Sequence, residues 1–339
     1  MPPTRRRSAE PVRRWALPLL ALLVLALFAA SLSVGPSAVS MRLAVADWLA
    51  DGDSTAAVIF AEIRLPRALL GLGVGAVLGL SGAALQGLLR NPLAEPGLIG
   101  VSASAALGAV IAFYSGLANA APLALPAGGI AGALTAVALL YALAGRDASV
   151  LTLILAGTAI GSLAGALTSL ALSLSPNPFA LTEIVFWMLG SLADRSLEHV
   201  ALAAPFMAVG AVLLLSAGRA LDALTLGEDT ARSLGFSIGA AGFRVIAGTA
   251  LAVGAAVAVS GAIGFVGLIV PHLLRPLAEN RPSRLLPLAA LGGAAFMLAA
   301  DVSVRLGGPG QEMKLGVVTA LLGAPFFLAL VLRTRRSVA

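Results

Sequence analysis

The chain is dominated by apolar runs of about 20 residues, each long enough to cross the roughly 30 Å of hydrocarbon in a lipid bilayer as one helix. Short charged or Pro/Gly-rich joints separate the runs. They lie at residues 15–34, 68–89, 98–117, 122–143, 150–174, 200–217, 245–259, 263–274 (a short one), 285–304 and 315–332. We therefore expect an all-α polytopic membrane protein with about ten transmembrane helices, forming a single domain over residues 1–339.

Composition agrees with this expectation and excludes several kinds of site. Hydrophobic residues make up 59% of the chain and charged residues only 11%, and its 38 glycines suit close helix packing in lipid. The chain has no cysteine, which excludes disulfides, thiolate metal sites and a cysteine nucleophile. The only histidines, His199 and His272, are too far apart in sequence to suggest a metal site. We expect no cofactor, no protein-bound metal and no nucleic-acid partner.

The distribution of basic residues predicts the orientation in the membrane. The first run follows a basic segment, residues 1–14, and is too long for the apolar core of a signal peptide, so we interpret it as a retained span. With ten spans, both termini lie in the cytoplasm and most basic residues face the same side. We therefore expect a multi-pass protein of the bacterial inner membrane. The exceptions that fall outside are Arg42, Arg64, Arg67, Arg195, Arg305 and Lys314.

Ten spans also fit two sets of five, the second inserted upside down, which is a common plan among transporters. The strings at residues 89–95 (LRNPLAE) and 274–279 (LRPLAE) resemble each other. In so biased a composition we interpret that likeness as coincidence.

ATP hydrolysis by this chain is excluded by its single lysine. A P-loop needs Gly-Lys-Ser/Thr, but Lys314 is followed by Leu315. The chain is therefore expected not to be an enzyme, and any ATPase site would belong to another polypeptide.

Two patterns suggest other classes of membrane protein. Gly79-Leu80-Ser81-Gly82, with His272 as a general base, matches an intramembrane serine protease, although tight packing of a small-residue helix is the simpler interpretation. Asp301, at the edge of an apolar run, could serve an ion-coupled secondary transporter. It could equally form an ion pair with Arg305, four residues later.

Two charged segments outside the spans suggest protein partners. The joint at residues 219–236 places Leu226, Ala231 and Leu234 on one face of a short helix, which would dock on a partner, on its own bundle or on lipid. Arg64-Leu65-Pro66-Arg67 presents two guanidinium groups around a rigid proline, suited to carboxylates or to lipid headgroups.

Taken together, five motifs resemble the iron-siderophore and cobalamin permease family of ABC importers (FecCD type) over nearly the full length. They are Arg64-Leu65-Pro66-Arg67; residues 81–102, from Ser81-Gly82 through Gln86 and RNPLAEPG (90–97) to Gly100-Val101-Ser102; residues 226–235, from LGE through Ala231 to Leu234-Gly235; residues 260–272 (SGAIGFVGLIVPH); and residues 316–327, from GVVT to GAPFF. This sequence departs from the family where Lys314 stands in place of a usual proline, and at joint 145–149, which matches poorly.

The resemblance implies an importer in which two permease subunits, identical or homologous, line a pathway above two ATP-binding subunits, and a soluble periplasmic or extracellular binding protein delivers the solute. It implies iron(III)-siderophore as cargo, with cobalamin or haem as alternatives, carried by alternating access. The implied binding-protein contacts are Arg64, Arg67 and Arg305. The implied contacts to the ATPase are Leu226, Gly227, Glu228, Ala231, Arg232, Leu234 and Gly235. The implied cytoplasmic gate is formed by Asn91 and Leu93.

Overall fold

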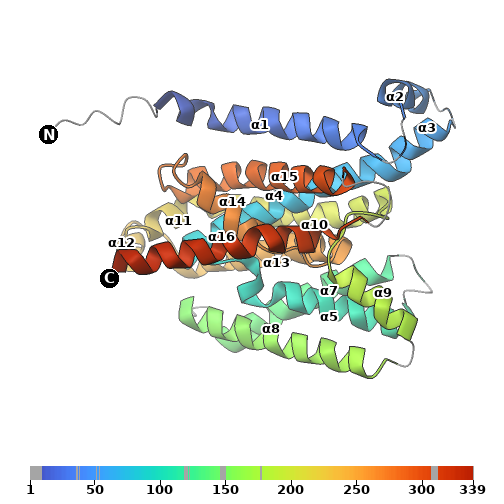
Figure 1. Ribbon diagram of the computed structural model, residues 1–339. Helices are drawn as coiled ribbons and strands as arrows, with labels where there is room; N and C mark the ends of the chain where they lie inside the picture. The colour runs from blue at the N-terminus through green and yellow to red at the C-terminus, as the bar shows by residue number, and fades with distance from the viewer. Residues whose placement is uncertain are drawn as a thin grey trace.

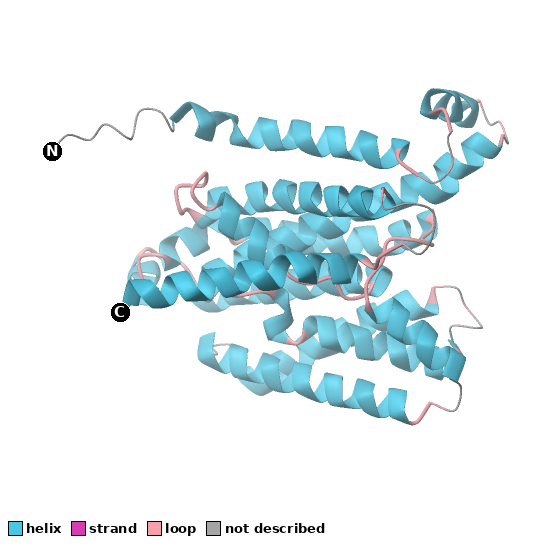
Figure 2. Cartoon of the chain, viewed as in Figure 1, coloured by secondary structure: helices cyan, strands magenta, loops and turns pink. Residues whose placement is uncertain are grey.

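A computed structural model of the chain describes residues 10–35, 37, 39–50, 52, 54–117, 121, 123–145, 150–175, 178–306 and 312–338. Across these ranges the regular elements are all helices and no strand occurs (Figure 2). The basic segment 1–14 lies mostly outside the described residues, and so does joint 145–149.

Ten principal helices overlap the ten predicted runs, which confirms the all-α polytopic fold. They are α1 (Glu10–Ser33), α4 (Leu65–Leu88), α5 (Val101–Tyr114), α7 (Ala124–Ala144), α8 (Val150–Ser173), α10 (Leu197–Ser216), α13 (Ile238–Ser260), α14 (Val266–Leu274), α15 (Pro282–Arg305) and α16 (Leu315–Val338). Among the described residues, seven helices are long and apolar enough to cross a membrane. With nine residues, α14 is only about 14 Å long and cannot span alone.

Shorter helices fill the connections, and most were not predicted. They are α2 (Met41–Leu49), α3 (Thr55–Val58), the π-helical turn η1 (Ile59–Arg64), the 3₁₀ turn η2 (Pro96–Ile99), α9 (Pro178–Met188), α11 (Gly218–Leu224) and α12 (Glu228–Ser233). The π turn lies directly before Pro66, whose missing N–H interrupts the regular hydrogen-bond ladder at that point. Helix α3, η1 and α4 form one continuous helical run over Thr55–Leu88.

Helices α4 and α13 form the centre of the bundle. Most of the residues in their apolar windows are buried inside the protein, 78% and 83% respectively, against 17% for α1. Helix α13 packs against α4, α5, α7 and α10, whereas α1 runs along the outside beside α15 (Figure 1). Such burial explains why α4 and α13 carry few polar side chains on any face.

The bundle has two distinct ends (Figure 1). At one end lie α12, the first turn of α1 and the last turn of α16; we call it the α12 end. At the other lie α2, α3 and α9, and we call it the α9 end. The predicted coupling segment, residues 219–236, thus lies at the same end as the first and last described helical turns.

The two sets of five principal helices show matching features. The second helix of each set, α4 and α13, is the most buried. The third, α5 and α14, is short and follows a residue with left-handed backbone, Gly100 (φ +73°) and Phe265 (φ +66°). The two LR-containing strings do not correspond in this alignment, because one follows α4 and the other follows α14. Their likeness therefore carries no support for the repeat, as the sequence interpretation held.

Candidate transport site

Arg64 is buried and points at the C-terminal end of α1, not into solvent. Only 3% of the residue is exposed, and its guanidinium donates hydrogen bonds to the carbonyl oxygens of Leu32 (3.0 Å), Ser33 (3.0 Å) and Ser37 (2.7 Å). The last carbonyls of a helix have no partner within the helix and carry partial negative charge. Arg64 therefore acts as a cap that fixes the end of α1.

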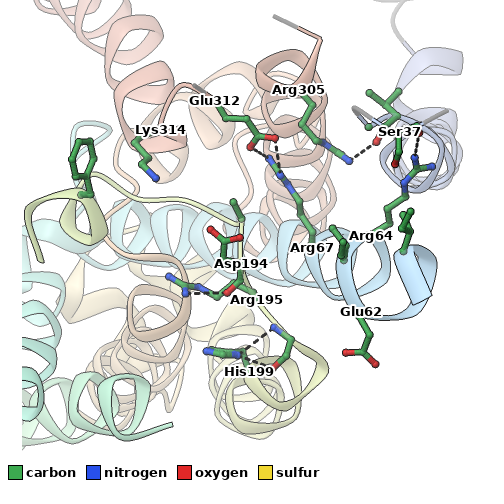
Figure 3. Close-up of a pocket in the computed structure, with 17 residues that line it drawn as sticks. Ser37, Glu62, Arg64, Arg67, Asp194, Arg195, His199, Arg305, Glu312 and Lys314 are labelled. Carbon is green, nitrogen blue, oxygen red and sulfur yellow. Dashed lines mark hydrogen bonds and ion pairs between the residues drawn. The ribbon is translucent and has the colours of Figure 1, made fainter. Parts of the chain in front are cut away.

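Arg67 faces a different set of partners. Its Nε lies 2.9 Å from Oδ1 of Asp301, and its Nη2 lies 2.8 Å from Oε2 of Glu312. Figure 3 shows the Arg67 side chain directed toward Glu312 and that of Arg64 directed away from it, toward Ser37. The two guanidinium groups of the Arg-Leu-Pro-Arg string therefore have different neighbours, the end of α1 for Arg64 and two carboxylates for Arg67.

Arg305, the last residue of α15, lies in the same charged cluster as Arg67 and Asp301. Its Nη2 forms an ion pair with Oδ2 of Asp301 at 2.8 Å, the (i, i+4) pairing that was one of the two alternatives for Asp301. Its Nη1 also donates to the carbonyl oxygens of Ser31 (2.8 Å) and Val34 (2.7 Å) at the end of α1. Arg64, Arg67 and Arg305 are thus all engaged within the chain.

Asp301 is fully buried between two arginines, Arg67 and Arg305. A carboxylate held in this way is fixed in place and already compensated, whereas a coupling-ion site needs a group that is free to exchange its ion. The arrangement gives no support to the secondary-transporter alternative.

A cavity of about 740 Å³ opens beside this cluster at the α9 end (Figure 3). Its charged lining residues are the basic Arg64, Arg67, Arg195, Arg305 and Lys314 and the acidic Glu62, Asp194 and Glu312. A second cavity of about 440 Å³ shares part of this lining. The outer basic residues that broke the positive-inside pattern, except Arg42, therefore gather around one space.

Arg195 holds the loop between α9 and α10 against α13. Its Nε donates to the carbonyl oxygen of Val259 at 2.5 Å. Burial lowers the pKa of Arg195, and the adjacent Asp194 carboxylate opposes that shift. Asp194 itself has a left-handed backbone (φ +57°), which marks the sharp turn that brings this loop to the cavity.

The predicted gate residues lie in a tight turn after α4. The backbone N–H of Leu93 donates to Oδ1 of Asn91 at 2.9 Å, which is the side-chain pattern of an Asx turn. Asn91 is exposed and Leu93 is half-buried. The turn is therefore locally rigid, and the gating role stays a prediction; the poorly matching joint that would face it lies outside the described residues.

The coupling segment contains most of α11 and the short helix α12, and Leu226 and Leu234 lie outside both helices. Ala231 is fully buried against the bundle, but Leu226 is 65% exposed and Leu234 59% exposed. The expectation that these three side chains share one face is wrong, because α12 spans only Glu228–Ser233 between two left-handed glycines, Gly227 (φ +103°) and Gly235 (φ +85°). Of these three residues, Ala231 is packed against the bundle, and the two leucines are uncovered among the described residues.

A polar contact that the sequence did not suggest ties this end to α15. Asp222 in α11 accepts hydrogen bonds from the backbone N–H of Ser283 (2.8 Å) and from its hydroxyl group (2.5 Å). Ser283 lies in the first turn of α15, and Arg305 ends the same helix at the other end of the bundle. A helix of 24 residues is about 36 Å long, so α15 joins the two ends as one element.

The protease alternative fails on geometry. Ser81 is fully buried, and its hydroxyl has no hydrogen-bond partner among the described residues, so no bond to His272 activates it. The neighbouring Gly82 packs backbone to backbone against Gly267, and a side chain there would collide with the Gly267 carbonyl. The Gly-x-Ser-Gly string is a packing surface of α4, which meets α15 at Gly79 and α14 at Gly82.

Comparison with known proteins agrees with this architecture. The family model described as the FecCD transport family matches residues 22–333. An ABC transporter permease protein of Bacillus subtilis, YvrB, is 42% identical over 283 residues, which cover 82% of this chain and 80% of the relative. The vitamin B12 import system permease protein BtuC of Salmonella paratyphi A is 40% identical over 326 residues, covering 95% of this chain and 96% of the relative.

A solved structure shows the same fold. It is described as an inward-facing conformation of a metal-chelate type ABC transporter; the two chains superpose with a TM-score of 0.81 at 36% identity, covering 94% of this chain and 99% of the other. The fold and the relatives define a class, the multi-pass membrane permease of the ABC transporter type. The chain belongs to the FecCD transport family.

Proposed function

We propose that this chain is the membrane-spanning subunit of a binding-protein-dependent ABC importer that carries iron(III)-siderophore by alternating access. One observation carries the proposal: a charged cavity at the α9 end and two uncovered leucines at the α12 end are joined through α15. Such a chain receives a solute at one end and a mechanical input at the other. It is a transport subunit without an ATPase site of its own.

The α12 end is the surface for the ATP-binding subunits. Leu226 and Leu234 are exposed, while Ala231 fixes α12 to the bundle, so a partner can bind the leucines and push on a rigid base. Gly227, Glu228, Arg232 and Gly235 complete this surface. Movement of α11 reaches α15 through the Asp222–Ser283 hydrogen bonds, which links ATP-driven closure to the spans.

The α9 end is the surface for the soluble binding protein. Arg64, Arg67 and Arg305 do not protrude, so we propose that an acidic segment of the binding protein enters the cavity that they line. Placing this end outside leaves both termini in the cytoplasm and the protein in the inner membrane. A second permease subunit completes the pathway, with Asn91 and Leu93 narrowing its cytoplasmic side.

A second cargo is favoured by the relatives. BtuC proteins of Salmonella paratyphi A and Halobacterium salinarum, named as B12 and cobalamin permeases, are 40% and 39% identical to this chain. Cobalamin is therefore the alternative, and haem is a third metal chelate. The importer mechanism is the same for all three.

The coupling surface is tested by replacing its exposed leucines. We expect Leu226→Asp combined with Leu234→Asp to abolish co-purification of the ATP-binding subunit, because charges would replace an apolar contact. The control is Leu43→Asp, since Leu43 is 67% exposed in α2 at the opposite end. Retained binding of the ATP-binding subunit by the double variant, with both proteins folded, would show that coupling lies elsewhere.

A further inference from the structure

One basic side chain at the α9 end has no role in the account so far. The guanidinium groups of Arg64, Arg67, Arg195 and Arg305 all donate hydrogen bonds within the chain. Lys314, the only lysine, forms no ion pair or side-chain hydrogen bond with any residue that the structure describes. Its Nζ lies 5.7 Å from the centroid of the Phe186 ring, a cation–π distance.

Lys314 occupies a fixed place. It directly precedes α16, whose first residue, Leu315, is buried. The next residue, Gly316, packs against the carbonyl groups of Leu189 and Ala262, where a side chain would not fit. Because the backbone is anchored immediately after Lys314, this residue keeps a fixed position beside both cavities that it lines.

Lys314 also lies where the two cavities meet. The 740 Å³ cavity and the 440 Å³ cavity share six lining residues. These are Phe186, Ala193, Asp194, Arg195, His199 and Lys314. A solute that moves from the larger cavity into the smaller one therefore passes Lys314 and Phe186.

The charges around this junction favour a negatively charged solute. The larger cavity has five basic and three acidic lining residues, and Glu312 is already paired with Arg67. The smaller cavity has two acidic and two basic ones, so the excess of positive charge lies on the side of the larger cavity. An ammonium group without a carboxylate partner attracts anions, and the adjacent aromatic ring offers a face to flat organic groups. Neutral solutes gain no charge-assisted contact there.

We propose that Lys314, with the Phe186 ring, forms a selectivity site for anionic metal chelates at the outer mouth of the pathway. This inference rests on the proposed function as an importer and narrows its cargo. A ferric chelate with catecholate ligands, which is anionic and aromatic, fits both groups. Cobalamin in its cyano form, which is neutral overall, uses only the ring.

The test measures ATP-dependent uptake into proteoliposomes that hold the permease, its ATP-binding subunit and its binding protein. The solutes are a tris-catecholate ferric chelate (anionic), a tris-hydroxamate ferric chelate (neutral) and cyanocobalamin. We expect Lys314→Gln to raise the apparent KM for the anionic chelate about fivefold to tenfold, the effect of one lost charge-assisted contact, and to leave the neutral solutes unchanged.

Two controls separate selectivity from docking and from bulk charge. Lys314→Arg keeps the charge and should retain most of the uptake, and Arg42→Gln removes an exposed outer charge away from the cavity. The affinity of the binding protein for each variant is measured in parallel and should not change with Lys314→Gln.

Each other outcome has a distinct meaning. Equal losses for all three solutes, together with weaker docking of the binding protein, would make Lys314 a docking residue and overturn the inference. Uptake of neutral solutes alone, unaffected by Lys314→Gln, would overturn it while leaving the importer intact. A wild-type complex that shows no ATP-dependent uptake of any of the three would overturn the proposed function first, and this inference with it.

Discussion

Arg64 and Arg305 both donate hydrogen bonds to carbonyl groups at the end of α1, a helix that is mostly exposed on the outside of the bundle. The sequence identified both arginines as exceptions to the positive-inside pattern. It could not show that they turn inward, because their acceptors are backbone carbonyls, which every residue carries. Glu312 escaped notice for a related reason, since its partner, Arg67, is 245 residues away.

The capping role predicts a stability effect that is independent of any partner. We expect Arg64→Gln to lower the free energy of unfolding in detergent by about 1–3 kcal/mol, because buried carbonyl groups lose a charged donor. Chemical unfolding followed by circular dichroism measures this change. Arg42→Gln, on the exposed part of α2, serves as the matched control. If both variants unfold alike, Arg64 is not a structural cap.

Helix α4 illustrates how the small residues of an apolar run determine packing. The sequence predicted the helix and the small-residue surface correctly, and the structure shows which helices lie against it. Gly82 lies against the backbone of Gly267 in α14, and Gly75 and Gly79 lie against α15. Which helix faces which glycine depends on contacts between distant segments, so it does not follow from local pattern.

The close approach of α4 and α14 predicts a specific intolerance. We expect Gly82→Ala to destabilise the protein by about 1–3 kcal/mol, because the added methyl group collides with the Gly267 carbonyl and forces the helices apart. The comparison is Gly242→Ala in α13, where nothing lies within 4 Å of the added atom. Thermal unfolding of the two purified variants provides the readout, and equal midpoints would contradict the packing described.

The whole molecule was predictable in outline, because long apolar runs, charge bias and five ordered motifs all act over the full length. These features predicted an all-α polytopic permease, which the fold and the relatives confirm. The boundaries were less predictable: α13 begins seven residues before its apolar run, and α9 fills a connection. Both segments are short and mostly apolar, so the length of an apolar run does not report where such helices begin or end. The cargo was least predictable, since it depends on a few side chains around one cavity.

The most direct test of the account is uptake of a labelled ferric siderophore by proteoliposomes that contain this chain with its candidate ATP-binding subunit and binding protein. The account predicts uptake that requires ATP and both partners and that disappears in the Leu226→Asp/Leu234→Asp variant. Uptake that continues without ATP and follows an imposed ion gradient would contradict it.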